Sequence, residues 1–429
     1  MAAMLALALG FIATPGFAQS SFSSDDPPIA RSGFITVPQV IGRGYTLNAS
    51  VVSRVDSNFQ RTGGTGTSAV RITPLVQAGI GTLLGRQQVY VGGSLGQDVF
   101  IDNSQFNRTQ FQVGGGAGLY LGSRCSFNVG TQYGQRQLLQ NDAVELADNL
   151  IKDFVAGGGF LCRGPVGIGF GTDVVYRTVR NGRSQRALFD FDSLTISPQL
   201  SYASRLGVFS LGANFSNFKY PNRPILTPDG FFEDELDVRS LRIGYSRPLG
   251  SRLQLSVGLS DFSTTPRPDT QLLPDPVGPP GSLISEPRTS AGGLGYDGTL
   301  TAQLGSRASI SISADRSFRG GGNVGALQTR AVNWGVDGDY RLTRSIAVGA
   351  GARFSDLDFI DSFASPDEPQ ARRSSKIQRY YGQINYSPTP RYSVGLEVAH
   401  LRRESDPEIF AFENTSVLLS MRVQFGRSG

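Results

Sequence analysis

From Tyr45 onward the sequence alternates apolar and polar residues in short segments that are separated by turns and loops. At 70–78, apolar residues hold the even positions and mostly polar residues hold the odd ones, and 310–314 repeats the pattern. A period of two places successive side chains on opposite faces of a β-strand. The pattern therefore predicts strands that have one apolar and one polar face.

Two kinds of connection alternate along the chain. Eight are tight turns with a near-repeat of the form Leu-Gly-Ser-Arg. Nine are longer and lie near residues 57–68, 99–108, 137–150, 178–187, 218–234, 263–291, 319–328, 356–375 and 402–412. Together they join eighteen strands of about ten residues, the length that spans an outer membrane. Short turns on one side and long loops on the other are typical of outer-membrane barrels, whose turns are periplasmic.

Aromatic residues on the apolar face gather beside the tight turns. A membrane-spanning barrel has such a girdle at the level of the lipid headgroups, whereas a soluble β-sandwich would place its aromatic residues in mid-strand. This distribution favours an all-β, transmembrane antiparallel barrel of about eighteen strands. The residues are Tyr202, Tyr245, Tyr340, Tyr386 and Tyr392.

Composition agrees with half-buried strands. Hydrophobic residues make up 39% of the 429 residues and glycine contributes 54, about twice its average share. No run of about 18 apolar residues follows Ala18, so we expect no transmembrane helix. The net charge of +5 comes from scattered residues, which argues against nucleic acid as a partner.

The first residues have the pattern of a secretory signal. An apolar stretch at 5–13 precedes Gly16-Phe17-Ala18, with small residues at the −3 and −1 positions of a cleavage site. We therefore predict a cleaved signal peptide at 1–18, a periplasmic N-terminal segment at 19–44 and an outer-membrane barrel at 45–429. The expected partners are outer-membrane lipid and the barrel-assembly machinery, because 417–425 resembles the C-terminal strand that this machinery recognises.

The first predicted hairpin carries an Asp-x-Asn-aromatic element, Asp56-Ser57-Asn58-Phe59, within 51–61. This element resembles the first hairpin of the β-barrel porin-2 family, outer-membrane barrels often encoded beside exopolysaccharide genes. The resemblance implies a porin-like channel linked to exopolysaccharide export, with the polysaccharide or its export machinery as a partner. Two alternatives stay open: a non-transporting anchor for surface polysaccharide, and a porin for sugar uptake.

Charged residues on the polar face are the candidate functional groups. If the barrel closes, acidic residues on three consecutive strands adjoin basic residues on later strands and on the second, and the resulting field would orient charged solutes. Alternatively, these charges pair across neighbouring strands, as Asp339 with Arg353 or Glu397 with Arg379, and contribute about 0.2–1 kcal/mol each. The candidates are Asp297, Asp315, Asp337, Asp339, Arg71, Arg353, Arg379 and Arg422.

Cys125 and Cys162 lie on the apolar face of neighbouring strands at the same rim. An oxidising periplasm allows a disulfide between them, whereas cross-strand strain allows two free buried thiols equally well, so both alternatives stay open. Two cysteines at this spacing make no zinc site, and we expect no metal or cofactor. The only histidine, His400, lies on the outward face without a catalytic partner, so we expect no enzyme.

The connection at 263–291 contains seven prolines, which stiffen it. Such a loop can fold into the lumen as a constriction or project from the barrel. Loops normally lie at the surface, so we predict projection.

Overall fold

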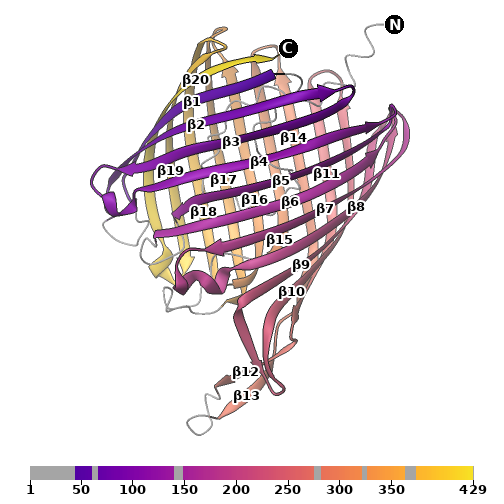
Figure 1. Cartoon of the computed structure of the whole chain (residues 1–429), viewed down its shortest axis with the longest axis vertical. Coiled ribbons are helices and arrows are strands. Elements are labelled where there is room, and N and C mark those ends of the chain that lie inside the picture. Colours follow the sequence, from indigo (N-terminus) through magenta and orange to yellow (C-terminus); the bar gives the residue numbers. More distant parts are fainter. Residues whose placement is uncertain are drawn as a thin grey trace.

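The computed structural model describes residues 44–59, 66–139, 148–274, 282–320, 326–362 and 373–428. Eighteen strands close into one antiparallel barrel, because β1 (Gly44–Asp56) pairs with both β2 (Ala69–Leu84) and β20 (Phe412–Ser428) (Figure 1). The predicted fold class and strand number are confirmed. No helix in these ranges is both long and apolar enough to cross a membrane. The predicted signal peptide at 1–18 and most of the segment at 19–44 lie outside the described residues.

The other barrel strands pair in chain order around the wall, with three 3₁₀ segments between them. The strands are β3 (Gln87–Phe100), β4 (Arg108–Leu121), β5 (Cys125–Leu139), β6 (Asp148–Cys162), β7 (Gly167–Asn181), β8 (Phe191–Ser204), β9 (Gly207–Thr227), β10 (Gly230–Leu249), β11 (Leu253–Arg267), β14 (Ala291–Leu304), β15 (Ala308–Gly320), β16 (Ala326–Arg341), β17 (Ile346–Ser362), β18 (Ser374–Thr389) and β19 (Tyr392–Asp406). The 3₁₀ segments are η1 (Ser104–Phe106), η2 (Ser184–Phe189) and η3 (Glu408–Phe410).

The alternation in the sequence becomes an apolar outer face. Leu95 on β3 lies opposite Val76 on β2 and Phe111 on β4, so side chains of one kind share a face around the wall. An outer face with so many exposed apolar side chains is typical of a barrel surrounded by lipid. Of the five rim tyrosines, four are exposed, and Tyr245 instead packs against the ring of Phe209 at 4.9 Å. They form the expected girdle beside the tight turns.

One long connection differs from the sequence-based expectation. Residues 218–234 are not a loop, since β9 and β10 continue as a paired hairpin with only 228–229 between them. β8 pairs with β9 only as far as Lys219, so the hairpin continues past its neighbour. Beyond the lipid, strands can stay hydrogen-bonded to each other without a strict alternation of apolar and polar residues. The periodicity of the sequence therefore did not predict strands at these residues.

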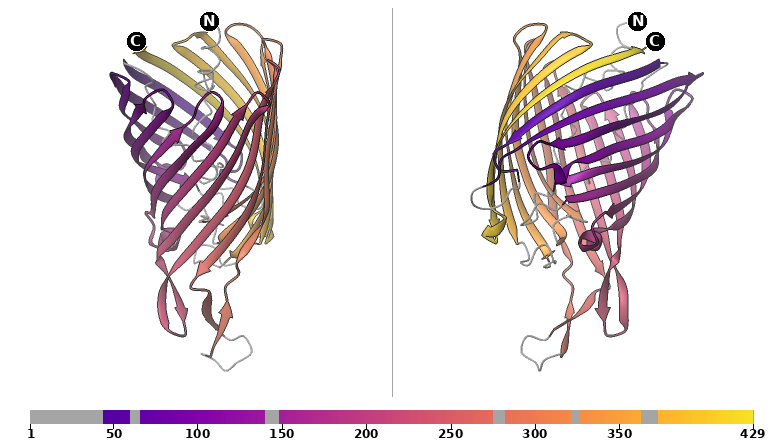
Figure 2. Two further views of the ribbon diagram at one scale, coloured as in Figure 1. Left: turned by 90° about the vertical axis from the view of Figure 1, so that its right-hand side faces the viewer. Right: turned by 60° about the vertical axis from the view of Figure 1, so that its left-hand side comes forward.

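The proline-rich connection forms a second small hairpin. β12 (Thr270–Pro274) pairs with β13 (Leu283–Pro287), and together they extend from the same end of the barrel as β9 and β10 (Figures 1 and 2). The described part of this connection therefore projects, as predicted. The end that carries both hairpins lies opposite the tight turns and is the extracellular end.

Candidate transport lumen

Glycine residues on the lumen face allow polar side chains from two strands to meet across the strand between them. Arg242 on β10 reaches Asp297 on β14 over Gly258 of β11. Its guanidinium donates two hydrogen bonds, Nε to Oδ1 at 2.8 Å and Nη2 to Oδ2 at 2.7 Å. A Cβ at Gly258 would lie 2.4 Å from the Asp297 carboxylate, so a larger residue would block the bridge.

A second bridge crosses β17. The Tyr381 hydroxyl on β18 donates to the carboxylate of Asp337 on β16, and Gly351 lies between them. The Arg353 guanidinium lies 3.6 Å from the same carboxylate. Asp337 therefore has one hydrogen-bond partner and one ionic partner.

The cluster continues onto β19. Arg379 forms an ion pair with Glu397 at 2.8 Å. The Tyr381 ring lies between two cations, with the Arg353 and Arg379 guanidinium carbons 5.8 and 5.3 Å from its centroid. Acidic and basic side chains are thus interleaved along β16 to β19 rather than separated into facing walls. The charges thus pair across strands, as in the second of the two interpretations of the sequence, but one of the two expected pairs has a different partner.

That change concerns Asp339 and Arg353, whose expected pairing is wrong. In the register of β16 and β17, Arg353 lies opposite Gly335, which makes Asp337 its diagonal neighbour and leaves Asp339 one step further away. Asp339 instead approaches Gln383 on β18 over the backbone of Gly349. The pairing of Gly335 with Arg353 therefore decides that Arg353 contacts Asp337 and not Asp339.

The remaining predicted charges lie apart from this cluster. Asp315 lies opposite Asp297 in the register and accepts a hydrogen bond from the Asn333 amide at 2.9 Å. Arg71 lies near the extracellular end of β2, where its guanidinium carbon is 6.0 Å from the Phe100 ring centroid. Arg422 is half-buried on β20 opposite Ser50 and Ser393. The structure does not bring these three residues together.

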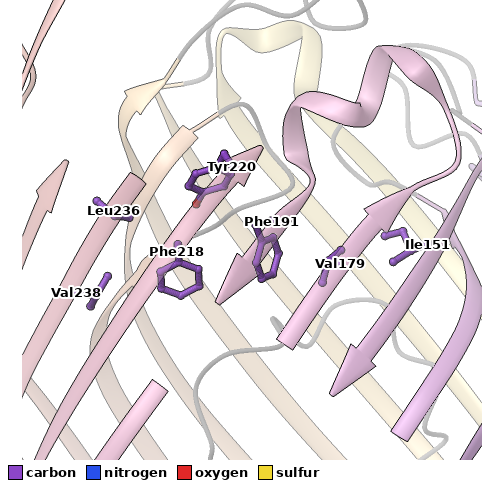
Figure 3. Close-up of a cluster of buried hydrophobic side chains, with 7 residues drawn as sticks. All are labelled: Ile151, Val179, Phe191, Phe218, Tyr220, Leu236 and Val238. Atoms are coloured by element: carbon purple, nitrogen blue, oxygen red, sulfur yellow. The ribbon is translucent and has the colours of Figure 1, made fainter. Parts of the chain in front are cut away.

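The extracellular part of the lumen face carries clusters of apolar side chains, which the alternation did not predict. A buried cluster comes from β6 to β10 (Figure 3) and consists of Ile151, Val179, Phe191, Phe218, Tyr220, Leu236 and Val238. These residues have the inward parity, since their strand neighbours Leu194 and Phe215 are exposed outside. The η2 segment contacts β7 and β9 beside the cluster. A second buried cluster at this end consists of Phe59, Ala69, Phe100 and Phe106.

A buried ionic trio supports the projecting hairpin. Asp234 on β10 accepts from Arg223 Nε at 2.5 Å and from Arg288 Nη2 at 2.7 Å. The exposed fractions of the three side chains are only 1%, 9% and 2%. The Arg223 guanidinium also stacks on the Tyr220 ring at 3.7 Å. Because Arg288 follows β13, the trio ties the two projecting hairpins together.

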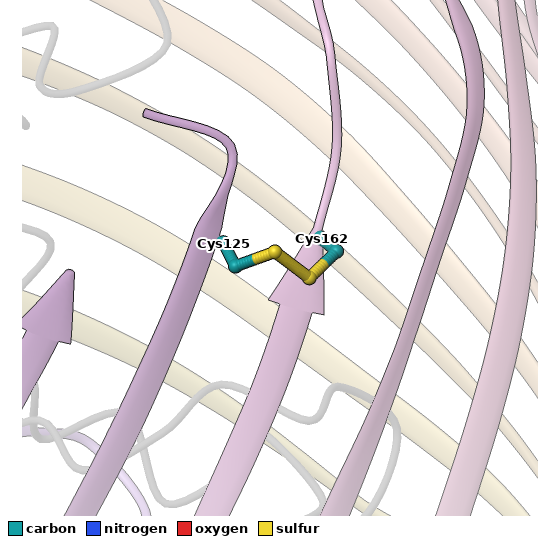
Figure 4. Close-up of a disulfide and its surroundings, with 2 residues drawn as sticks. All are labelled: Cys125 and Cys162. Carbon is teal, nitrogen blue, oxygen red and sulfur yellow. A yellow bond between two sulfur atoms is a disulfide. The ribbon is translucent and has the colours of Figure 1, made fainter. Parts of the chain in front are cut away.

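Cys125 and Cys162 lie opposite each other on β5 and β6 and are joined by a disulfide (Figure 4). The bond lies on the outer face, at the end of both strands beside the tight turns. It connects two strands that are already paired along their length.

Comparisons with known proteins support the fold. No family model matches the sequence, and no curated protein matches it. The structure is similar to the FrpB iron transporter of Neisseria meningitidis (F5-1 variant), with 11% identity, a TM-score of 0.52, 85% of this chain covered and 64% of that chain. The F3-3 variant gives 12% identity, a TM-score of 0.51, and coverage of 89% and 67%. The outer membrane protein opdK of Pseudomonas aeruginosa gives 12% identity and a TM-score of 0.45, with 89% of this chain and 99% of that chain covered.

The chain spans slightly less than two thirds of the F5-1 FrpB chain. At these identities the likeness concerns the fold alone. Closed pairing of eighteen strands, an exposed apolar exterior and a rim girdle define the class: the protein is a β-barrel of the bacterial outer membrane.

Proposed function

We propose that this barrel is a channel for polar solutes. An eighteen-strand barrel is wide enough to leave an aqueous interior unless loops fill it. The observation that carries the proposal is the Arg242–Asp297 pair, whose side chains face the lumen and are 43% and 41% exposed. Charged side chains that are exposed to this extent must be solvated, so their exposure on the lumen face indicates water in the lumen.

The apolar extracellular clusters support a selective channel rather than a wide pore. These side chains are buried, so other parts of the chain cover the lumen face at that end, whereas the charged pairs in the middle of the wall stay partly exposed. A solute would therefore meet a partly covered lumen at that end and charged side chains in the middle of the wall. Pores commonly select through charged rings and apolar constrictions.

Exopolysaccharide is the cargo that we propose, with export as the direction. Its support is the Asp56-Ser57-Asn58-Phe59 element, which resembles the first hairpin of the β-barrel porin-2 family. Deletion of the gene should lower polysaccharide in the culture medium while polymer accumulates in the periplasm. Medium polysaccharide at the parental level, with intact surface attachment, would contradict export.

Single-channel recording in planar bilayers tests the channel itself. The purified full chain should give stable conductance steps. The D337N/D339N variant removes two acids from the lumen face and takes from Arg353 its carboxylate partner, so selectivity should shift toward anions. D229N removes an exposed acid from the tip of the β9–β10 hairpin and should leave selectivity unchanged. A folded, inserted protein without conductance would instead favour the surface-anchor alternative.

A further inference from the structure

Every tight turn at the periplasmic end carries an arginine, and none carries an acidic residue. All eight side chains are exposed, and none of them forms an ion pair with another described residue. The turn between β9 and β10, at the opposite end, instead carries Asp229. We call this set the arginine rim: Arg86, Arg124, Arg163, Arg205, Arg252, Arg307, Arg344 and Arg391.

The register places the best-defined members on the lumen side. Arg124 and Arg163 directly continue the ladder past the outward-facing cysteines, and the Arg163 N–H donates to the Arg124 carbonyl at 2.8 Å. Because strand positions alternate, both arginines take the inward parity. A Cβ built on the inward-facing Gly169 would lie 3.2 Å from the Arg163 Cβ, which places that side chain on the lumen face.

The same arrangement recurs between β15 and β16. The Arg341 N–H donates to the Arg307 carbonyl at 2.7 Å, one position past the pair formed by Ala308 and Tyr340. Tyr340 is exposed on the outer face, so Arg307 and Arg341 take the inner one. Two pairs of opposed arginines thus lie at separate points of the periplasmic mouth.

Like charges directly opposite each other destabilise a strand pair. No acid among the described residues forms an ion pair with either arginine pair. Asp339 lies two residues before Arg341 on the inner face of β16, and it approaches Gln383 instead. An anion at the mouth would relieve this repulsion, and guanidinium groups bind carboxylate and phosphate through paired hydrogen bonds.

We propose that the arginine rim binds the carboxylate or phosphate groups of an anionic solute at the periplasmic mouth. The inference builds on the proposed channel, because it assigns a charge class to the cargo. Lipid headgroups are the competing ligand. The neighbours of the opposed arginines, Cys125, Cys162 and Tyr340, face lipid at this level, whereas the arginines themselves face inward. This placement favours a solute in the lumen.

Binding of a fluorescent alginate oligosaccharide to the full chain in non-ionic detergent tests the proposal without requiring conductance. The wild type should bind it and should not bind a neutral dextran oligosaccharide of equal length. R124Q/R163Q should weaken binding about tenfold, since two charge contacts are lost. R267Q/R402Q removes two exposed arginines at the extracellular end and should change binding less than about twofold.

Absence of wild-type binding, or equal losses in the two double variants, would overturn the proposal. So would a lipid result: R124Q/R163Q abolishing stabilisation by phosphatidylglycerol vesicles, relative to phosphatidylcholine, while alginate binding persists. In bilayers, alginate oligosaccharide should reduce conductance only from the side of the tight turns. A wild type that binds alginate without conducting would count against the channel and leave the anion site standing.

Discussion

Replacement of Asp234 by alanine should release the projecting β9–β10 hairpin while the barrel stays folded. The carboxylate is almost fully buried and is shared by Arg223 and Arg288. Its removal leaves two buried guanidinium groups without their common anion. Loss of one partner from a buried ionic group costs about 3–5 kcal/mol. Since 1.4 kcal/mol is about a tenfold change, local opening should become at least about 100 times more frequent.

Hydrogen exchange followed by mass spectrometry measures this opening directly. Amides in the outer parts of β9 and β10 should lose about 100-fold or more of their protection in D234A, while amides beside the tight turns keep theirs. D297A is the matched control, because it also removes a carboxylate that accepts two guanidinium hydrogen bonds. The side chains of that pair are 43% and 41% exposed, against 1% for Asp234, so loss of the pair should cost less than about 1 kcal/mol. Equal protection in D234A and the wild type would refute the argument.

Two further predictions concern contacts between strands of the barrel wall. In G351V the added side chain would collide with the Tyr381 ring, so ion selectivity should change while heat-modifiable folding on gels persists; Gly382, which has open space around its Cβ, supplies the control G382V. Unaltered selectivity in G351V would contradict the bridge. Peptide mapping without reductant should recover a Cys125–Cys162 cross-link, and C125S/C162S should lose about 2–4 kcal/mol in urea unfolding. Thiol labelling of the untreated protein would contradict that bond.

Local periodicity was sufficient to predict the architecture of the wall. Strand number, the tight turns and the rim tyrosines all depend on residues close in sequence, and lipid enforces strict alternation on every membrane-spanning strand. Where strands leave the lipid, that constraint ends. The outer parts of β9 and β10 therefore looked like a loop at 218–234, although their backbones remain paired.

The candidate site was less predictable because its partners come from distant strands. Parity placed Asp337 and Arg353 on the lumen face, but the register of β16 and β17 decides that they pair with each other. The bridge to Tyr381 depends in addition on a glycine in the strand between. Phe218 and Leu236 also follow the inward parity, yet they are buried, and the η2 segment contacts β7 and β9 beside them. The alternation of apolar and polar residues therefore predicts which face of the strand a side chain lies on, but not whether other parts of the chain cover that face.

The two projecting hairpins have a consequence for how the cell presents this protein. β9, β10, β12 and β13 extend past the described barrel wall on the side opposite the tight turns (Figures 1 and 2). An antibody or phage that approaches from the medium meets them before it meets the described wall. The turn at 228–229 lies at the tip of the projecting β9–β10 hairpin, so a short epitope inserted there would be displayed on living cells.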